Sequence, residues 1–262
     1  MSTDRAFPDP TAWPEGVARH VLDEVDSTNS EAARLAPHLT QPTWIMARRQ
    51  TAARGRRGRV WVSPEGNLAA TLVMRPAGEP AQVALRSFVA ALALADAMAL
   101  VTGPGAVISL KWPNDVLLNG GKVAGILLES TGAGTGTGAG VSHLAIGIGV
   151  NLIAAPPQEA VEPGAAVPVS VLGETGVRIA PEDFLTYLAA AFARWEGQLV
   201  TWGFAPVRNA WLGRAARLGQ PVTARTMTET ITGTFDTLGE DGSLILKTAA
   251  GRRAIPAADV YF

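Results

Sequence analysis

The chain has 262 residues, 47% hydrophobic and 17% charged, which suits one or two globular domains and excludes an intrinsically disordered chain. Its formal net charge of -1 provides no overall attraction for nucleic acid or anionic membranes, so any basic site must be local. The chain has no cysteine and three histidines, which excludes disulfides, thiolate nucleophiles and cysteine-ligated metals and argues against a histidine-ligated metal.

The N-terminal segment predicts a protein that is not exported. Residues 1–16 contain charges and prolines but no apolar core, so we expect no signal peptide. The most apolar stretch, residues 88–101, is too short to span a bilayer and contains Asp96. We therefore expect a cytoplasmic protein without a membrane segment.

Apolar periodicity and turn residues predict the elements of a larger domain over residues 1–214. Its first helix begins with Ser27 or Thr28 as the N-cap, and Asn119-Gly120-Gly121 predicts a hairpin turn. The tight turns between consecutive strands indicate antiparallel pairing. The predicted helices are 28–36, 81–101 and 182–200, and the predicted strands are 43–49, 67–76, 107–111, 115–118, 122–129 and 143–150.

Short alternating strands separated by turn residues predict a second, β-barrel-like domain over residues 215–262. A domain of about 48 residues is marginally stable alone, so we expect it to pack against the larger one. Trp202, Phe204 and Trp211 are the aromatic residues that could fill this interface. The fold class is therefore α+β, with a mixed or antiparallel sheet, flanking helices and a small β domain.

Two segments have biased composition. The glycine-rich run at 132–140 contains G-x-G patterns, but it lies between two predicted strands and no helix follows. It therefore predicts a flexible hairpin loop and not a dinucleotide-binding turn. Residues 154–180 are rich in proline and glycine and lack periodicity, which predicts a long loop that could order over a ligand.

An arginine-rich segment covers residues 48–59. It contains six arginines, and no Asp or Glu occurs between residues 32 and 64. Guanidinium groups repel one another unless an anion binds, and the interspersed glycines allow backbone N–H groups to approach that anion. The segment therefore predicts a polyphosphate or nucleic-acid site that stays open until its ligand arrives, with a solvated basic loop as the alternative.

Lysine is rare in this chain, yet Lys111 and Lys122 both lie in the predicted hairpin region. An ammonium group among apolar neighbours suits a carboxylate or phosphate oxygen, although a solvated lysine at a strand end is the commoner case. Asn114 and Asp115 offer oxygen ligands that Mg²⁺ accepts beside nucleotide phosphates. A turn-capping role would explain these two residues equally well.

Two further motifs suggest a binding site. The side chains of Ser27, Thr28 and Asn29 can all donate and accept hydrogen bonds at the start of a helix. Helix capping would account for only one of these three polar residues. Gly147 and Gly149 alternate along an apolar strand and therefore face one way. They form either a flat floor for a ring or base, or a place where another element packs tightly.

In this order, the motifs resemble those of biotin protein ligase, the biotin–[acetyl-CoA carboxylase] ligase family. The matching strings are DSTN at 26–29, QTAARGRRGRVWVSPEGNL at 50–68, KWPNDVLLNGGKVAGILLE at 111–129 and GIGVNL at 147–152, followed by a β-rich tail. The resemblance implies a class II aminoacyl-tRNA synthetase-like fold with a C-terminal SH3-like barrel. It also implies that biotin and ATP form biotinyl-5′-AMP and pyrophosphate, and that biotin is then transferred to a lysine of a carrier protein.

The resemblance also implies a role for each matching residue. Lys122 and Arg56 would be catalytic, and Asp115 would also bind Mg²⁺. Ala53 departs from the family pattern, which has glycine at this position. The implied biotin-binding residues are Ser27, Thr28, Asn29, Gln50, Arg54, Gly55, Arg56, Lys122 and Gly147. The implied nucleotide-binding residues are Arg54, Arg56, Arg59, Trp61, Lys111, Asn114, Asp115 and Asn151.

The expected partner is the biotin carboxyl carrier protein of acetyl-CoA carboxylase or a related carboxylase. Because 26 residues precede Ser27, we expect the ligase-only form, without a DNA-binding domain or a specific nucleic-acid partner. The sequence leaves the oligomeric state open, with a homodimer as one option. A lipoate-type ligase is the nearest alternative. An RNA-binding module would need stacking aromatics in the basic segment, and only Trp44 and Trp61 flank it.

Overall fold

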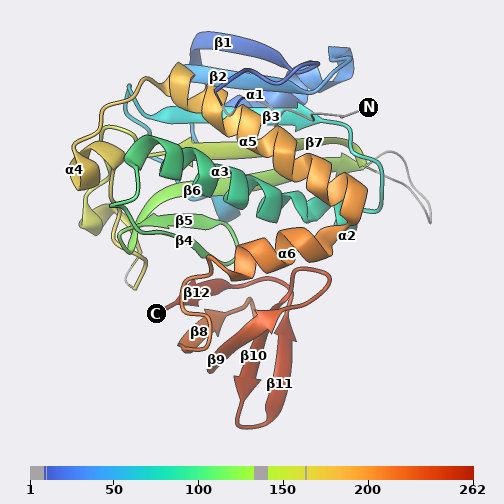
Figure 1. Cartoon of the computed structure of the whole chain (residues 1–262), viewed down its shortest axis with the longest axis vertical. Helices are drawn as coiled ribbons and strands as arrows, with labels where there is room; N and C mark the ends of the chain where they lie inside the picture. Colours follow the sequence, from blue (N-terminus) through green and yellow to red (C-terminus); the bar gives the residue numbers. More distant parts are fainter. Residues whose placement is uncertain (1–8, 10, 133–140, 163) are drawn as a thin grey trace, which may run out of the picture.

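A seven-stranded mixed sheet forms the larger part of the computed structural model, which describes residue 9 and residues 11–132, 141–162 and 164–262 (Figure 1). The strand order is β1-β2-β3-β7-β6-β5-β4. The first two strands are parallel and all other neighbours are antiparallel. The strands are β1 (Ala18–Val25), β2 (Thr43–Gln50), β3 (Leu68–Met74), β4 (Ile108–Lys111), β5 (Asp115–Leu118), β6 (Gly121–Gly132) and β7 (Val141–Val150).

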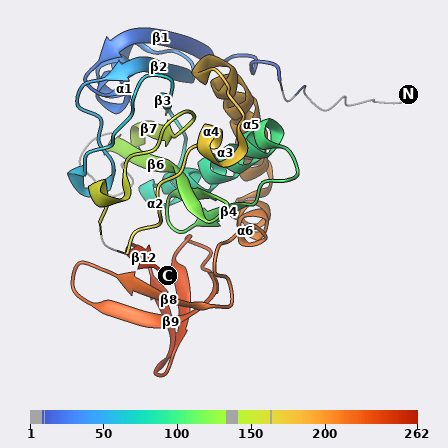
Figure 2. The same cartoon turned by 90° about the vertical axis from the view of Figure 1, so that its left-hand side faces the viewer.

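Helices pack on both faces of this sheet (Figure 2). On one face lie α3 (Arg86–Thr102) and α5 (Pro181–Trp202), and on the other lies α1 (Thr28–Leu35). The side chains of β2 alternate accordingly, because Trp44 joins the large core with α3 and α5 while Ile45 packs in a smaller cluster with α1. The remaining helices are α2 (Pro80–Ala84), α4 (Val171–Thr175), α6 (Phe204–Leu212) and the 3-10 turns at Ala36–His38, Arg56–Gly58 and Gln158–Ala160.

The apolar helix predicted at 81–101 is longer than expected and is broken at Leu85 into α2 and α3. Together these helices span Pro80–Thr102, 23 residues that are long and apolar enough by length and composition to cross a membrane. The exclusion of a membrane span on length was therefore wrong. However, 67% of the most apolar window is buried inside the molecule, as expected for a core helix.

The C-terminal domain is a five-stranded antiparallel sheet of order β11-β10-β9-β8-β12. Its first and last strands in that order are edges that do not pair with each other, so the sheet is open and the expected barrel is absent from the described residues. The final strand has only three residues, and these line a cavity of the larger domain. The strands are β8 (Pro221–Arg225), β9 (Thr230–Leu238), β10 (Leu244–Thr248), β11 (Gly251–Ile255) and β12 (Asp259–Tyr261).

Aromatic residues join the two domains, as expected, although not all of those predicted take part. Trp211 is buried and its ring contacts Phe88 of α3 and Phe235 of β9. Phe204 also packs on Phe88. Trp202 is 68% exposed, so its predicted role in the interface was wrong.

Besides the 3-10 turns, three elements were not predicted, namely β1, α4 and α6, and α4 lies within the expected long loop at 154–180. The other predicted helices and strands are present, with ends shifted by a few residues. Most of the glycine-rich hairpin predicted at 132–140 lies outside the described residues.

Candidate active site

A cavity of about 450 Å³ opens between the sheet, the arginine-rich segment and β12. Every residue singled out from the sequence as a binding or catalytic candidate lines it, although these residues come from distant parts of the chain. They are Ser27, Thr28, Asn29, Gln50, Arg54, Gly55, Arg56, Arg59, Trp61, Lys111, Asn114, Asp115, Lys122, Gly147 and Asn151. The individual roles assigned to them stay predictions.

The start of α1 forms one polar end of the cavity. Gln50 Oε1 accepts from the Thr28 backbone N–H at 2.7 Å, and Thr71 Oγ1 lies 2.6 Å from Asn29 Oδ1 and 2.8 Å from Thr28 Oγ1. Ser27 is the N-cap residue by backbone geometry, but its side chain makes no capping hydrogen bond. The polar triplet is therefore buried and held in place by neighbouring strands, beyond what helix capping requires.

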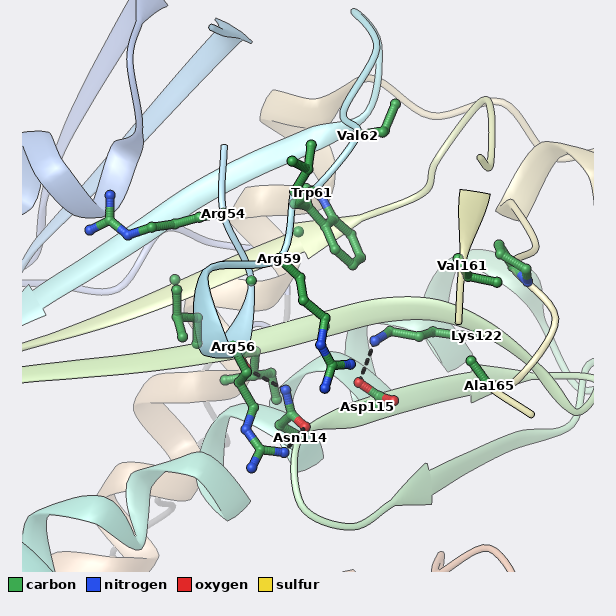
Figure 3. Close-up of a pocket in the computed structure, with 18 of the residues that line it drawn as sticks. Arg54, Arg56, Arg59, Trp61, Val62, Asn114, Asp115, Lys122, Val161 and Ala165 are labelled. Carbon is green, nitrogen blue, oxygen red and sulfur yellow. Dashed lines mark hydrogen bonds and ion pairs between the residues drawn. The ribbon is translucent and has the colours of Figure 1, made fainter. Parts of the chain in front are cut away.

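Glu129 is a polar partner of this end that the sequence did not reveal. Its carboxylate accepts from Asn29 Nδ2 at 2.8 Å and pairs with Arg54 Nη2 at 3.1 Å. Arg54 Nη1 also donates to Ser30 Oγ at 2.8 Å. Arg54 therefore points away from Arg56 and Arg59 (Figure 3), and it stabilises the α1 end of the cavity.

Two lysines meet one carboxylate at the opposite end. Lys122 Nζ lies 2.6 Å from Asp115 Oδ1 (Figure 3). Lys111 Nζ lies 3.7 Å from Asp115 Oδ2. Antiparallel pairing of β5 and β6 produces this arrangement, because it places Lys122 opposite Leu117, two residues after Asp115, and long side chains can reach such a diagonal neighbour. Burial lowers the pKa of Lys111, and Asp115 opposes that shift.

Asn151 lies beside this lysine pair at the end of β7. It is buried, and its Nδ2 donates to the Val169 carbonyl at 3.0 Å, while its Oδ1 has no hydrogen-bond partner among the described residues. Such an acceptor is costly to bury alone.

The glycine strand is a site of close packing. A Cβ at Gly147 would lie 2.2 Å from Asn29 Oδ1, and a Cβ at Gly149 would lie 2.5 Å from Trp61 Nε1. Gly125 on the neighbouring strand faces the same indole. These glycines therefore allow Asn29 and Trp61 to pack closely on the strand, which supports the packing interpretation of the motif. The same glycines line the cavity, so a floor for a ligand ring stays a prediction.

The arginine-rich segment is held by carboxylates from other parts of the chain. Asp259 pairs with Arg57 Nη1 at 2.7 Å, with Arg59 Nη2 at 2.5 Å and with Arg56 Nη1 at 3.5 Å. Burial lowers the pKa of Arg56, and Asp259 opposes that shift. Further pairs join Arg48 to Asp23, Arg49 to Glu24 and Arg59 to Glu162.

These pairs overturn the expectation that nothing offsets the repulsion within the empty segment. The stretch from 32 to 64 has no acid of its own, but the fold brings acids to it from β1, β6 and β12. The left-handed backbone positions are Arg57 (φ 56°) and Gly58 (φ 72°). Ala53 is outside that region, so alanine there creates no backbone strain.

The described residues contain no group of three or more His, Cys, Asp or Glu that could hold a metal. Asp115 faces two ammonium groups. A magnesium ion fits here only as part of a nucleotide complex, in which phosphate oxygens and water supply most of its ligands.

Sequence comparisons place this geometry among known proteins. Residues 21–151 match the model of the biotin/lipoate A/B protein ligase family, and residues 218–262 match the biotin protein ligase C terminal domain. A biotin–[acetyl-CoA-carboxylase] ligase of Paracoccus denitrificans is 60% identical over 92% of this chain and 99% of its own length. A bifunctional ligase/repressor of Bacillus subtilis (strain 168) is 31% identical over 94% of this chain and 75% of its own length.

Solved structures agree with the sequence matches. The biotin protein ligase of Aquifex aeolicus in complex with biotin and ATP superimposes with a TM-score of 0.76 and 26% identity. The match covers 93% of this chain and 98% of that one.

Proposed function

The chain belongs to the biotin/lipoate A/B protein ligase family, and we propose that it is a biotin–[acetyl-CoA-carboxylase] ligase. The observation that carries this proposal is the cavity itself. It combines a polar end at α1 with a cationic end at Lys111, Lys122 and the arginine-rich segment. Such a cavity suits a ligand with a neutral polar ring at one end and negative charge at the other, as biotinyl-5′-AMP has.

The reaction has two steps. In the first, a carboxylate oxygen of biotin attacks the α-phosphorus of ATP, and the bond from that phosphorus to the bridging oxygen of pyrophosphate breaks. In the second, the side-chain amine of an acceptor lysine attacks the biotinyl carbonyl carbon, AMP leaves and the amine loses a proton. The first step needs stabilisation of phosphate charge and no nucleophile from the protein.

The α1 end of the cavity would bind the biotin ring system. Ser27, Thr28 and Asn29 are buried, and they are held by Gln50 and Thr71 in fixed orientations. Fixed donors and acceptors of this kind select a ligand that has a complementary polar ring.

Lys122 would bind where the biotin carboxylate meets the α-phosphate. Its side chain is 28% exposed, and its ammonium lies 5.6 Å from the centroid of the Trp61 ring and has Asp115 as its ion-pair partner. When phosphate oxygens bind, this ammonium can stabilise the charge that spreads over them in the transition state.

The nucleotide would bind toward Arg56, Arg59 and the β4–β5 hairpin. Lys111, Asn114 and the unpaired acceptor of Asn151 lie on this side. Magnesium would enter with the phosphates, and Asp115 would be its protein ligand. The ion would neutralise phosphate charge during the first step.

Two alternatives fit the cavity and the relatives less well. A lipoate-type ligase shares the family, but the 60% identical relative is named as a biotin ligase. An RNA-binding module would need exposed aromatics near the basic segment. Trp44 is buried in the core, and Trp61 packs on the glycine floor.

The cellular context of the reaction belongs to the same proposal. A biotin carboxyl carrier protein would supply the acceptor lysine, and the reaction would take place in the cytoplasm. We expect no specific nucleic-acid partner, and the enzyme could act as a monomer or a homodimer.

ATP–pyrophosphate exchange tests the proposal directly. Labelled pyrophosphate should be incorporated into ATP when biotin is added. It should not be incorporated when lipoate replaces biotin or when neither acid is present. Exchange with lipoate alone would assign the lipoate reaction, and no exchange with either acid would reject an adenylating enzyme.

A further inference from the structure

One carboxylate of the C-terminal domain binds three arginines of the segment that covers the cavity. Asp259 Oδ2 lies 2.7 Å from Arg57 Nη1 and 2.5 Å from Arg59 Nη2, and Asp259 Oδ1 lies 3.5 Å from Arg56 Nη1. The backbone carbonyl of Ala258 also accepts from Arg56 at 3.3 Å. These contacts join β12 to a segment about 200 residues away in the chain.

Asp259 is well placed to fix the position of these guanidinium groups. Its side chain is only 14% exposed, and β12 is held by antiparallel pairing with β8, in which Asp259 lies opposite Arg225. Its main-chain position therefore depends on the C-terminal sheet and not on the arginine-rich segment. The arginine-rich segment has less regular structure after β2 ends at Gln50, namely one 3-10 turn at Arg56–Gly58 and a single β-bridge between Arg54 and Val60.

The charges at this contact do not cancel. Three guanidinium groups face one carboxylate, and Glu162 pairs only with Arg59, at 3.3 Å. Positive charge therefore remains above the cavity after the segment has been placed. The guanidinium donors are therefore already close together when a polyphosphate binds. This arrangement reduces the conformational entropy that the arginine side chains lose on binding.

We propose that Asp259 is a positioning residue for adenylation, which holds Arg56, Arg57 and Arg59 over the cavity before the nucleotide binds. The inference rests on the proposed function of the same cavity. It assigns a specific task to the C-terminal domain, which is to supply the fixed anion against which the segment is ordered. The carboxylate touches the arginines and is assigned no contact with the reacting atoms.

The first test measures how fast trypsin cleaves the arginine-rich segment in the full-length protein without substrates. This measurement does not depend on enzyme activity. The arginines are trypsin sites, and a segment held by Asp259 is a poor protease substrate. We expect Asp259→Asn to raise the rate of cleavage within residues 54–59 by about tenfold, equivalent to 1.4 kcal/mol. Asp259→Glu should restore most of the protection, because it keeps the charge.

A matched control is Asp236→Asn. Asp236 lies in the same sheet and pairs with Lys247 and Arg252, but it does not line the cavity. This variant should cleave like the wild type. Thermal unfolding of all three variants shows whether any of them has lost the fold. If Asp259→Asn has lost it, Arg57→Gln replaces it, because this variant removes one of the three ion pairs from the other side and leaves the trypsin sites at Arg54, Arg56 and Arg59.

The second test measures ATP–pyrophosphate exchange with biotin. Because Arg56, Arg57 and Arg59 can gather again around bound phosphates, the cost of losing Asp259 should fall on nucleotide binding. We expect Asp259→Asn to raise the KM for ATP about tenfold and to change kcat by less than about twofold. Asp259→Glu should restore the wild-type KM. A contact with only a structural role would not raise the KM for ATP while leaving kcat nearly unchanged.

Two outcomes would overturn the inference: unchanged cleavage in folded Asp259→Asn, or a KM for ATP equal to or below that of the wild type. The failure of the proposed function is distinguishable from both. If the wild type itself shows no biotin-dependent exchange, the ligase assignment is rejected, while the cleavage experiment still reports whether Asp259 holds the segment.

Discussion

Lys122 Nζ lies 2.6 Å from Asp115 Oδ1 in the substrate-free cavity, so the predicted catalytic lysine has an internal anion as its partner. The two residues are brought together by the β5–β6 hairpin, which is anchored in the core by buried neighbours such as Val116 and Val123. This ion pair orients the ammonium at the place where phosphate oxygens would bind.

Removing the Lys122 ammonium should slow adenylation without unfolding the protein. We expect Lys122→Ala to lose about 2–4 kcal/mol of transition-state stabilisation, as for the loss of one preorganised donor. Single-turnover formation of biotinyl-AMP measures this. Lys247→Ala is the matched control, because Lys247 is 61% exposed on the C-terminal sheet. Formation of biotinyl-AMP at the wild-type rate by Lys122→Ala would disprove its assignment.

Arg56 should retain the reactive intermediate. Its guanidinium contacts Asn114 at 3.3 Å and the Ala258 carbonyl, and it thus connects the arginine-rich segment to both domains. We expect Arg56→Gly to release biotinyl-AMP faster and to label lysines of bystander proteins. Biotinylation of added serum albumin measures the leak. A variant that still makes the adenylate but labels albumin no faster than the wild type would contradict the retaining role.

Gly149→Ala should displace Trp61. The new Cβ would lie 2.5 Å from the Trp61 Nε1 position, and the indole, on a loop, can move away more easily than the strand. We expect weaker nucleotide binding, a change in tryptophan fluorescence, and less than about 1 kcal/mol of lost stability. Gly132→Ala is the control on the same pair of strands, because no described residue lies within 4 Å of its Cβ position. Wild-type affinity in Gly149→Ala would show that Trp61 does not shape the site.

Asp26 should contribute stability only above acidic pH. Hydrogen bonds from Arg34 lower the pKa of Asp26 from 3.8 to about 2. A lowered folded-state pKa gives stabilisation that is present above about pH 4 and disappears as the pH falls toward 2. Since both side chains are about half exposed, Asp26→Asn should cost less than about 1 kcal/mol at neutral pH. Urea unfolding of the wild type and of Asp26→Asn between pH 7 and pH 2 measures the difference in their free energies of unfolding. If this difference persists at pH 2, it does not come from the ionisation of Asp26.

Nucleic-acid binding by the arginine-rich segment should be weak. Its arginines are already paired with carboxylates, and the chain has a net charge of -1. We expect binding to duplex DNA or RNA to be independent of sequence and to fall steeply with salt. Fluorescence anisotropy with labelled duplexes measures this. Sequence-selective binding tighter than about micromolar at physiological salt would contradict the prediction.

The cavity residues could be predicted because each belongs to a local pattern with an unusual composition. Six arginines in one segment, two of the few lysines in one hairpin and alternating glycines are visible without any tertiary information. Their partners are not visible in this way. Glu129 and Asp259 are ordinary acids in ordinary strands, and only the fold brings them to Arg54 and Arg57.

The missed strand β1 has a similar explanation. It lies at the edge of the sheet, and most of its side chains are exposed or half-buried. An edge strand therefore lacks the apolar alternation that identifies a strand with one buried face. The expected barrel was wrong for another reason, since strand length and spacing predict the number of strands but not whether the first and last ones pair.

The pairing of Arg57 with Asp259, which lie 202 residues apart, has a consequence for synthesis on the ribosome. Arg56, Arg57 and Arg59 leave the exit tunnel long before the carboxylate that holds them, so they pass through a stage in which they lack Asp259 and are close to ribosomal RNA. The seven-stranded sheet can form during this interval, because its last strand ends at Val150. Translation of the final strand would then complete a protein whose central core is already in place, and the newborn enzyme would gain its activity last.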